Sequence, residues 1–126
     1  MKWDIVYLII GAVAGVLIRY EITGDSLFFG SVPVSVLIVN ITGSFILGLS
    51  STAVSSFGLD QRYTLLVGIG FCGTLTTMST FALETVNLLS VGKLLIAAAD
   101  ITLNVGASLL AIVAGRAIIL ALVGTV

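Results

Sequence analysis

Residues 70–84 read GFCGTLTTMSTFALE and bring five hydroxyl side chains into the middle of an otherwise apolar stretch. The hydroxyls belong to Thr74, Thr76, Thr77, Ser79 and Thr80. Because hydrocarbon offers no hydrogen-bond partners, polar side chains and irregular backbone at membrane depth persist only inside protein or along a water-filled path. The stretch therefore predicts a break near residues 73–80 of a spanning helix. It also predicts that this part of the helix contacts a transported or bound polar species rather than lipid.

The surrounding composition is that of a small integral membrane protein. Of 126 residues, 59% are hydrophobic and 9% are charged, and the mean hydropathy is +1.28. A spanning helix needs about 20 apolar residues, so four spans use nearly the whole chain and leave no room for a soluble catalytic domain. We expect one all-α domain over 1–126 in the cell (plasma) membrane. Its spans are expected at approximately 3–20, 34–55, 63–89 and 94–120.

Several functional classes are disfavoured by what the chain lacks. It has no histidine, which removes the commonest metal ligand and proton shuttle. Cys72 is the only cysteine, so an internal disulfide cannot form. A net charge of −1 without a basic patch gives no sign of nucleic-acid binding. No nucleophile with a neighbouring base and no phosphate-binding motif is visible, so we do not expect an enzyme.

The charges between the spans give almost no preferred orientation. With four spans, Lys2, Arg62 and Arg116 fall on one side of the membrane, and Arg19 and Lys93 fall on the other. Cytoplasmic loops normally carry an excess of Lys and Arg, and this excess sets the orientation of insertion. A chain without that bias can insert both ways and pair as an antiparallel dimer. Chance near-balance of so few charges explains the same count.

The second and fourth spans carry polar side chains at membrane depth. Asp100, Asn104 and Ser108 recur every four residues and therefore lie on one helix face. Asn40 offers two N–H donors and one carbonyl acceptor at a single point. Ionisable residues inside the membrane usually mark a substrate or ion path. The alternative is that these groups only join helices, at about 0.6 kcal/mol for each hydrogen bond.

The third span adds a polar face of its own. Thr76, Thr80 and Glu84 are spaced by four residues, and Phe81 flanks them. The positive edge of a phenyl ring could contact a poorly hydrated anion, although a Phe in a membrane helix more often simply packs. A break in this span would also free backbone carbonyls, which are hard oxygen ligands for a small cation.

Four segments together resemble the fluoride channel family called Fluc or CrcB. The matching stretches are GAVAGVLIRY at 11–20, VNITGSF at 39–45 with Gly48, GFCGTLTTMSTFALE at 70–84 and, more weakly, LNVGAS at 103–108. The resemblance implies a four-helix protomer that pairs antiparallel into a homodimer with two fluoride pores. It also implies a structural Na⁺ at the dimer centre, held by the carbonyls of Gly73 and Thr76 from each subunit. Some members of the family pair as two different subunits, so a heterodimer is a second expectation.

The resemblance also assigns roles along the ion pathway. It implies that Asn40 contacts fluoride, that Phe81 belongs to the aromatic pair lining the pore and that Arg19 lies at the aqueous vestibule. Asn104 and Ser108 are similar to the family's polar track. The remaining candidates are Thr77, Met78, Ser79, Thr80 and, near the pore exit, Glu84.

Two positions depart from the family pattern Gly-Gly-x-Thr-Thr-Phe-Ser-x-Phe. Thr74 stands for the second Gly, and Met78 stands for the first Phe. Met offers a polarizable thioether in place of a ring edge, so one aromatic contact in each pore is missing.

The resemblance implies a passive channel that lets F⁻ leave the cytoplasm and excludes the larger Cl⁻. The first alternative is a small dual-topology exporter of drug-like cations. The mechanism of such an exporter resembles proton exchange at a membrane-embedded Glu in the first span. That span contains no acid beyond Asp4 at its mouth. The second alternative is a non-transporting packing subunit. It predicts that an apolar residue of similar size at Asn40 leaves every ion flux unchanged.

Overall fold

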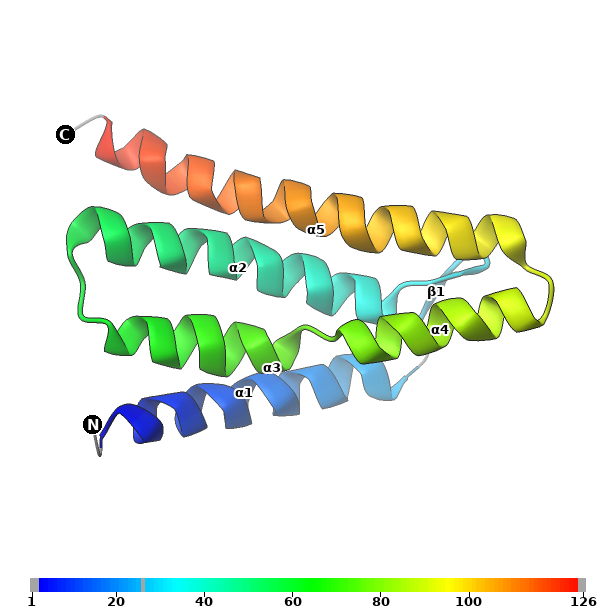
Figure 1. The fold of residues 1–126 in the computed structure, drawn as a ribbon, viewed down its shortest axis with the longest axis horizontal. Helices are drawn as coiled ribbons and strands as arrows, with labels where there is room; N and C mark the ends of the chain where they lie inside the picture. Colours follow the sequence, from blue (N-terminus) through cyan, green and yellow to red (C-terminus); the bar gives the residue numbers. More distant parts are fainter. Residues whose placement is uncertain (1–2, 26, 125–126) are drawn as a thin grey trace.

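Four long rods of helix lie side by side and give the protein an elongated form (Figure 1). The computed structural model describes residues 3–25 and 27–124. The rods are α1 (Asp4–Gly24), α2 (Ser35–Phe57), a third composed of several helical pieces over Thr64–Ser90, and α5 (Leu94–Val123). Each is long and apolar enough to cross a membrane. The prediction of a helical, multi-pass membrane protein with four spans is confirmed.

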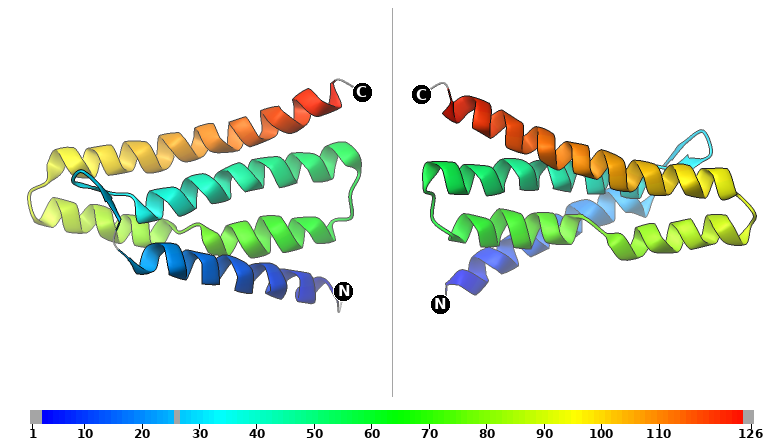
Figure 2. Two further views of the ribbon diagram at one scale, coloured as in Figure 1. Left: turned by 180° about the vertical axis from the view of Figure 1, so that it is seen from behind. Right: turned by 45° about the horizontal axis from the view of Figure 1, so that its top comes forward.

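In Figures 1 and 2 the rods follow the order α5, α2, the third span and α1, and the second half of the third span, residues 78–90, packs mainly against α5. Along the chain, each rod runs opposite to the one before it, so α5 and α2, which lie side by side, run in the same direction. The two ends of the described chain lie at the same end of the bundle. The loop that contains Arg62 lies at this end, and the turn that contains Lys93 lies at the other. Lys2, which was also assigned to the first end, lies outside the described residues.

The outer surfaces of the rods suit a lipid environment. Large apolar side chains such as Leu17 on α1 and Leu110 on α5 are exposed along the bundle. The small core consists of side chains such as Val39, Leu75 and Ala97, each at most 1% exposed. A helix that is apolar on all faces belongs in lipid or in a protein interior, which explains the weak amphipathic pattern of these spans.

Glycines allow α1 to approach the third span closely. A Cβ added to Gly11 would collide with the carbonyl oxygen of Leu66, and one added to Gly15 would collide with that of Phe71. Small residues four apart are a common means of bringing membrane helices into backbone contact. The Gly11 and Gly15 pair is therefore a site of backbone contact, and its partner is the first half of the third span.

A second glycine contact joins α2 to α5. A Cβ at Gly48 would meet the backbone of Ile112, and a Cβ at Gly115 would meet the carbonyl oxygen of Phe45. The two helices thus approach through reciprocal glycines near the end of the bundle that holds the chain termini. Toward the other end they leave room for polar side chains between them.

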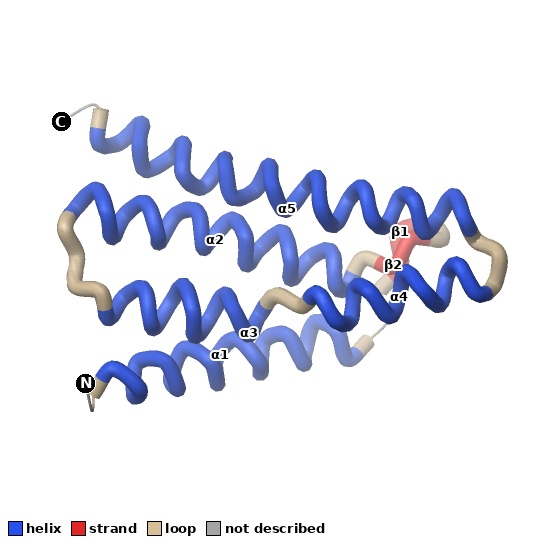
Figure 3. The backbone as a smooth tube through the Cα atoms, in the orientation of Figure 1, coloured by secondary structure: helices blue, strands red, loops and turns tan. Residues whose placement is uncertain are grey.

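The third span is irregular along its length. It begins as η1 (Thr64–Cys72), a π-helix in which the N–H of Gly73 bonds to the carbonyl of Gly68. A short turn, α3 (Gly73–Leu75), follows, and α4 (Met78–Ser90) completes the span. Between α3 and α4 the backbone is extended, with φ −76° and ψ 154° at Thr76 and φ −149° and ψ 114° at Thr77 (Figure 3).

The connection between the first two spans begins later than the predicted end of the first span near residue 20. The helix continues past Tyr20 to Gly24, and a short antiparallel hairpin follows, formed by β1 (Phe28–Phe29) and β2 (Val32–Pro33). Gly30 turns this hairpin with φ +62°, a conformation that L side chains rarely adopt. Helical hydrogen bonding can continue beyond the apolar segment, so the end of the apolar run at Tyr20 did not mark the end of the helix.

Candidate functional site

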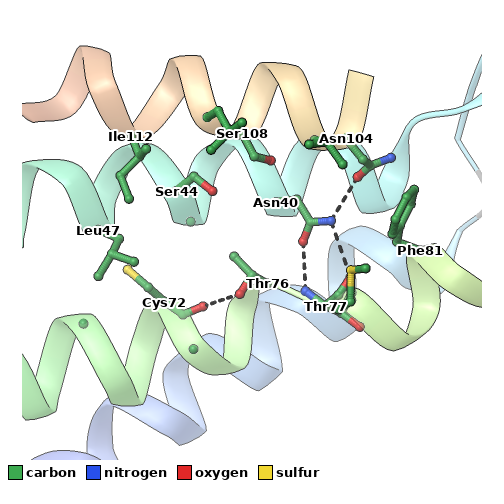
Figure 4. A pocket seen from close by; sticks show the side chains of 16 residues that line it. Asn40, Ser44, Leu47, Cys72, Thr76, Thr77, Phe81, Asn104, Ser108 and Ile112 are labelled. Atoms are coloured by element: carbon green, nitrogen blue, oxygen red, sulfur yellow. Dashed lines mark hydrogen bonds between the residues drawn. The ribbon is translucent and has the colours of Figure 1, made fainter. Parts of the chain in front are cut away.

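A groove of about 420 Å³ lies between α2, the irregular third span and α5 (Figure 4). Its lining combines small or apolar side chains with a few polar ones. The polar lining residues are Asn40, Ser44, Thr76, Thr77, Asn104 and Ser108. The structure thus brings together predicted candidates from three different spans.

Asn40 is the central polar group of this groove. Its Oδ1 accepts a hydrogen bond from the N–H of Thr77 at 2.8 Å, and its Nδ2 donates to Oδ1 of Asn104 at 2.9 Å. A longer contact of 3.4 Å joins Nδ2 to the carbonyl oxygen of Thr77. In Figure 4, Asn40 lies between the third span and α5 and joins both to α2. One of its two N–H groups is therefore firmly bound, and the other is bound only weakly.

The irregular backbone deprives two carbonyls of their usual helical partners. In a continuous α-helix, the N–H of Thr77 would bond to the carbonyl of Gly73, and that of Thr80 to the carbonyl of Thr76. Instead, the Thr77 N–H donates to Asn40, and the Thr80 N–H donates to Oγ1 of Thr77 at 3.2 Å. Both carbonyls are thereby released from α-helical bonding at the point where the sequence predicted cation ligands.

The guanidinium of Arg19 reaches the same place from α1. Its Nη1 donates to the carbonyl oxygen of Thr76 at 3.4 Å, a long hydrogen bond. Arg19 does not line the groove, but it places a positive charge directly behind the extended residues. Such a charge raises the electrostatic potential at the groove and thus favours an anion there.

The hydroxyl of Thr77 forms hydrogen bonds with those of Ser79 and Thr80 at the N-terminus of α4. Thr77 is the N-cap, and its Oγ1 lies 3.0 Å from Oγ1 of Thr80 and 3.3 Å from Oγ of Ser79. Side-chain oxygens at an N-cap satisfy the free N–H groups of the first turn. Of these three predicted pathway residues, only Thr77 also lines the groove.

Thr74 faces away from the groove. Its Oγ1 lies within hydrogen-bonding distance of three carbonyl oxygens: that of Ala12 on α1 at 3.0 Å, that of Gly70 at 2.7 Å and that of Phe71 at 3.3 Å. This departure from the family pattern therefore strengthens the contact between α1 and the third span, and its side chain does not enter the groove.

Ser108 has a hydroxyl that the fold leaves unused. Its Oγ is buried and has no hydrogen-bond partner among residues 3–25 and 27–124. A helical serine commonly bonds to the carbonyl four residues earlier, and this one does not. Since Ser108 lines the groove, it offers an unpaired O–H donor to whatever enters.

The two large side chains of the motif differ in exposure. Phe81 is 6% exposed and lines the groove, whereas Met78 lines it while remaining 72% exposed in the single protomer. Phe81 is therefore both a packed side chain and part of the groove wall. The ring at this position and the thioether at 78 supply the apolar share of the lining.

Glu84 lies apart from the groove. It borders a second cavity of about 350 Å³, together with residues of the hairpin such as Phe28 and residues of α2 such as Ser35. Its Oε2 is buried and has no hydrogen-bond partner in the described part of the chain. The structure does not bring Glu84 together with Asn40.

The sequence did not indicate that Thr85 belongs to this polar system. Its Oγ1 lies 3.0 Å from Oδ2 of Asp100, and Asp100 in turn accepts from Asn104. Thr85 does not share the four-residue spacing of Thr76, Thr80 and Glu84, so the sequence alone did not distinguish it from a helix-packing threonine. Its position one residue from an acid on the same helix was the only available signal.

Comparison with known proteins assigns the chain to a family. Residues 6–116 match the family model described as CrcB-like protein, Camphor Resistance (CrcB). The chain belongs to the CrcB family. It is similar to a fluoride-specific ion channel FluC of Nitrosopumilus maritimus, with 43% identity over 115 residues and 91% of each chain covered. FluC of Alteromonas mediterranea is 43% identical over 108 residues, covering 83% of this chain and 85% of its own. FluC of Methanocaldococcus jannaschii is 38% identical over 113 residues, covering 90% and 91%.

The CrcB match contains the whole groove. Its range of 6–116 includes parts of all four spans and every residue that lines the 420 Å³ groove. The groove is therefore a feature of the CrcB part of the chain rather than of an added segment.

Proposed function

We propose that this protein is a fluoride-selective channel that lets F⁻ leave the cytoplasm passively along the groove at Asn40. Support comes from the CrcB match and from relatives named fluoride-specific ion channels. The observation that carries the proposal is a pair of groove donors that the fold binds weakly or not at all. The second N–H of Asn40 is weakly bound, and the hydroxyl of Ser108 has no partner in the described residues.

These donors suit a small anion that must lose water. A charged partner makes a hydrogen bond about twice as strong as a neutral one, so two donors lining the same groove would offset part of the dehydration cost. The positive edge of the Phe81 ring adds a further weak contact. The larger Cl⁻ is proposed to be excluded once a second subunit narrows the groove. Fluoride enters acidified cells as neutral HF and dissociates inside, so a passive pore suffices for its export.

The channel is proposed to work as an antiparallel homodimer with two pathways, and a heterodimer is the alternative. The groove is open on one side in the single protomer and would be closed by a second subunit. The carbonyls of Gly73 and Thr76 are released from helical bonding and would hold the proposed Na⁺ between the two subunits. The long hydrogen bond from Arg19 to the Thr76 carbonyl would have to yield to the ion. When bound, the ion would supply a positive charge that holds the two interrupted helices together.

The other candidate functions have less support. The relatives are named as ion channels, which is not an enzyme class. Their names also disfavour an exporter of drug-like cations.

The proposal is tested by fluoride efflux from liposomes that contain only this protein, read with a fluoride electrode beside a chloride control. Wild type is expected to release F⁻ rapidly and to retain Cl⁻. Asn40→Leu removes both N–H donors at similar size, and loss of a hydrogen bond to a charged partner predicts a roughly 10- to 100-fold slower F⁻ efflux. Thr102→Val is the matched control, since its exposed hydroxyl bonds only to Ala98 outside the groove. Absence of F⁻ efflux from folded wild-type dimers would overturn the stand-alone channel.

A further inference from the structure

Asp100 is a fully buried acid that the proposed pathway does not use directly. It lies on α5, is 0% exposed and does not line the groove. Its Oδ1 accepts from Nδ2 of Asn104 at 2.9 Å, and its backbone carbonyl accepts from the same nitrogen at 3.2 Å. Desolvating a carboxyl is costly, so its complete burial indicates that its hydrogen bonds have a structural or functional role.

Asp100 is one end of a chain of hydrogen bonds that runs in a single direction. The backbone N–H of Thr77 forms the other end and can only donate; it bonds to Oδ1 of Asn40. Nδ2 of Asn40 then donates to Oδ1 of Asn104, whose Nδ2 donates to Asp100. Each amide has one donor face and one acceptor face. With a fixed donor at one end and fixed acceptors at the other, only one orientation of both amides satisfies every group.

A side-chain contact holds the carboxyl of Asp100 in place. Oδ2 lies 3.0 Å from Oγ1 of Thr85 on α4, and the same hydroxyl lies 3.0 Å from the carbonyl oxygen of Phe81. Thr85 is itself buried. The carboxyl is thus bonded at both oxygens and cannot rotate without breaking one of the two contacts.

We propose that Asp100 is a positioning residue that orients Asn104 and, through it, Asn40. The inference rests on the proposed function, because it concerns the donor that Asn40 presents to the ion. If Asn104 turned its amide over, it would face the Nδ2 of Asn40 with another donor. Asn40 would then turn as well and would lose the N–H of Thr77. The acceptor at Asp100 therefore keeps both the pathway amide and the extended backbone in their observed arrangement.

What the arrangement requires at position 100 is an acceptor aimed at Asn104. Asn satisfies this requirement: its Oδ1 accepts from Asn104, and its Nδ2 donates to Oγ1 of Thr85, which donates to the carbonyl of Phe81. Leu has similar volume and no polar atom. Asp100→Asn is therefore the matched conservative variant of Asp100→Leu, and the pair separates acceptor geometry from charge.

The first experiment measures fluoride efflux for Asp100→Asn, Asp100→Leu, Asn104→Leu and the Asp100→Leu/Asn104→Leu double variant. Asp100→Asn is expected within about 3-fold of wild type, and Asp100→Leu about 10- to 100-fold slower. The double variant is expected to be no more than about 2-fold slower than Asn104→Leu, because groups acting through one network are not additive. Equal loss in Asp100→Asn and Asp100→Leu would overturn the proposal, as would additive losses in the double variant.

The second experiment follows amide hydrogen exchange at Thr77 and requires no ion flux. Exchange is expected to quicken in Asp100→Leu and to stay at the wild-type rate in Asp100→Asn. Unchanged exchange in a folded Asp100→Leu would overturn the positioning role. If Asp100→Leu does not fold, Thr85→Val releases Oδ2 alone, and the proposal requires faster exchange at Thr77 there too. Failure of wild type to conduct fluoride would defeat the proposed function, while the exchange result would still decide the positioning role.

Discussion

At the scale of single side chains, Ser108 lines the groove with a hydroxyl that the described fold does not use. Its hydroxyl has no partner among the described residues, so Ser108→Ala should leave thermal stability in detergent within about 0.5 kcal/mol of wild type. Fluoride efflux should nevertheless slow by roughly 10-fold, since one donor to a charged ion is lost. The matched control is Ser55→Ala, whose exposed hydroxyl bonds to Ser51 outside the groove. A variant that is less stable but conducts normally would identify Ser108 as a helix-joining group instead.

The sequence predicted the site best at the level of individual residues. Asn40, Asn104 and Ser108 were predicted as site residues because amides and hydroxyls are costly to place in hydrocarbon. The structure brings all three together around one groove. Their roles in ion passage stay predictions. The pairing of Asn40 with Asn104 could not be foreseen, because contact between residues 64 positions apart depends on how α2 and α5 pack. Glu84 shared a helix face with Thr80 in the sequence, yet it borders a different cavity.

At the scale of elements, the close contact of α1 with the third span gives a stability prediction. Gly11→Ala would force a Cβ into the carbonyl of Leu66, and overpacking typically costs about 1–3 kcal/mol. We expect a lower melting temperature in detergent. Gly106→Ala on α5 is the matched control, because a Cβ there meets nothing within 4 Å and alanine favours a helix. Equal melting temperatures for the two variants would contradict the backbone contact.

The elements themselves were predictable to different degrees. Four spans follow from the length and hydropathy of the apolar runs, and the structure has helices at each of them. The π-helical bonding of Thr64–Cys72 was not predicted, since a shift from the fourth to the fifth residue leaves no pattern in an all-apolar stretch. The hairpin after Gly24 was also missed. It has only four paired residues and lies between two predicted spans, where no secondary structure had been predicted.

At the scale of the whole molecule, the near-even distribution of Lys and Arg connects sequence to assembly. Three basic residues on one side against two on the other give little direction to insertion. If the working unit is an antiparallel dimer, both orientations must be made. A chain forced into one orientation should then fail to form the pair and should lose fluoride efflux, even though each protomer folds normally.

Two charge variants test this requirement at exposed ends of the spans. Phe57→Lys with Leu59→Lys moves the balance to five against two on the end that holds Arg62. Phe29→Lys, Val91→Lys and Leu94→Lys together move it to five against three on the opposite end. Each variant alone is expected to insert in a single orientation and to give little efflux from vesicles of the expressing cells. Expression of both in one cell should restore it, because the two orientations are then supplied by different chains. Full efflux from either variant alone would exclude the antiparallel pair, and the groove would then have to be closed by a parallel copy or by lipid.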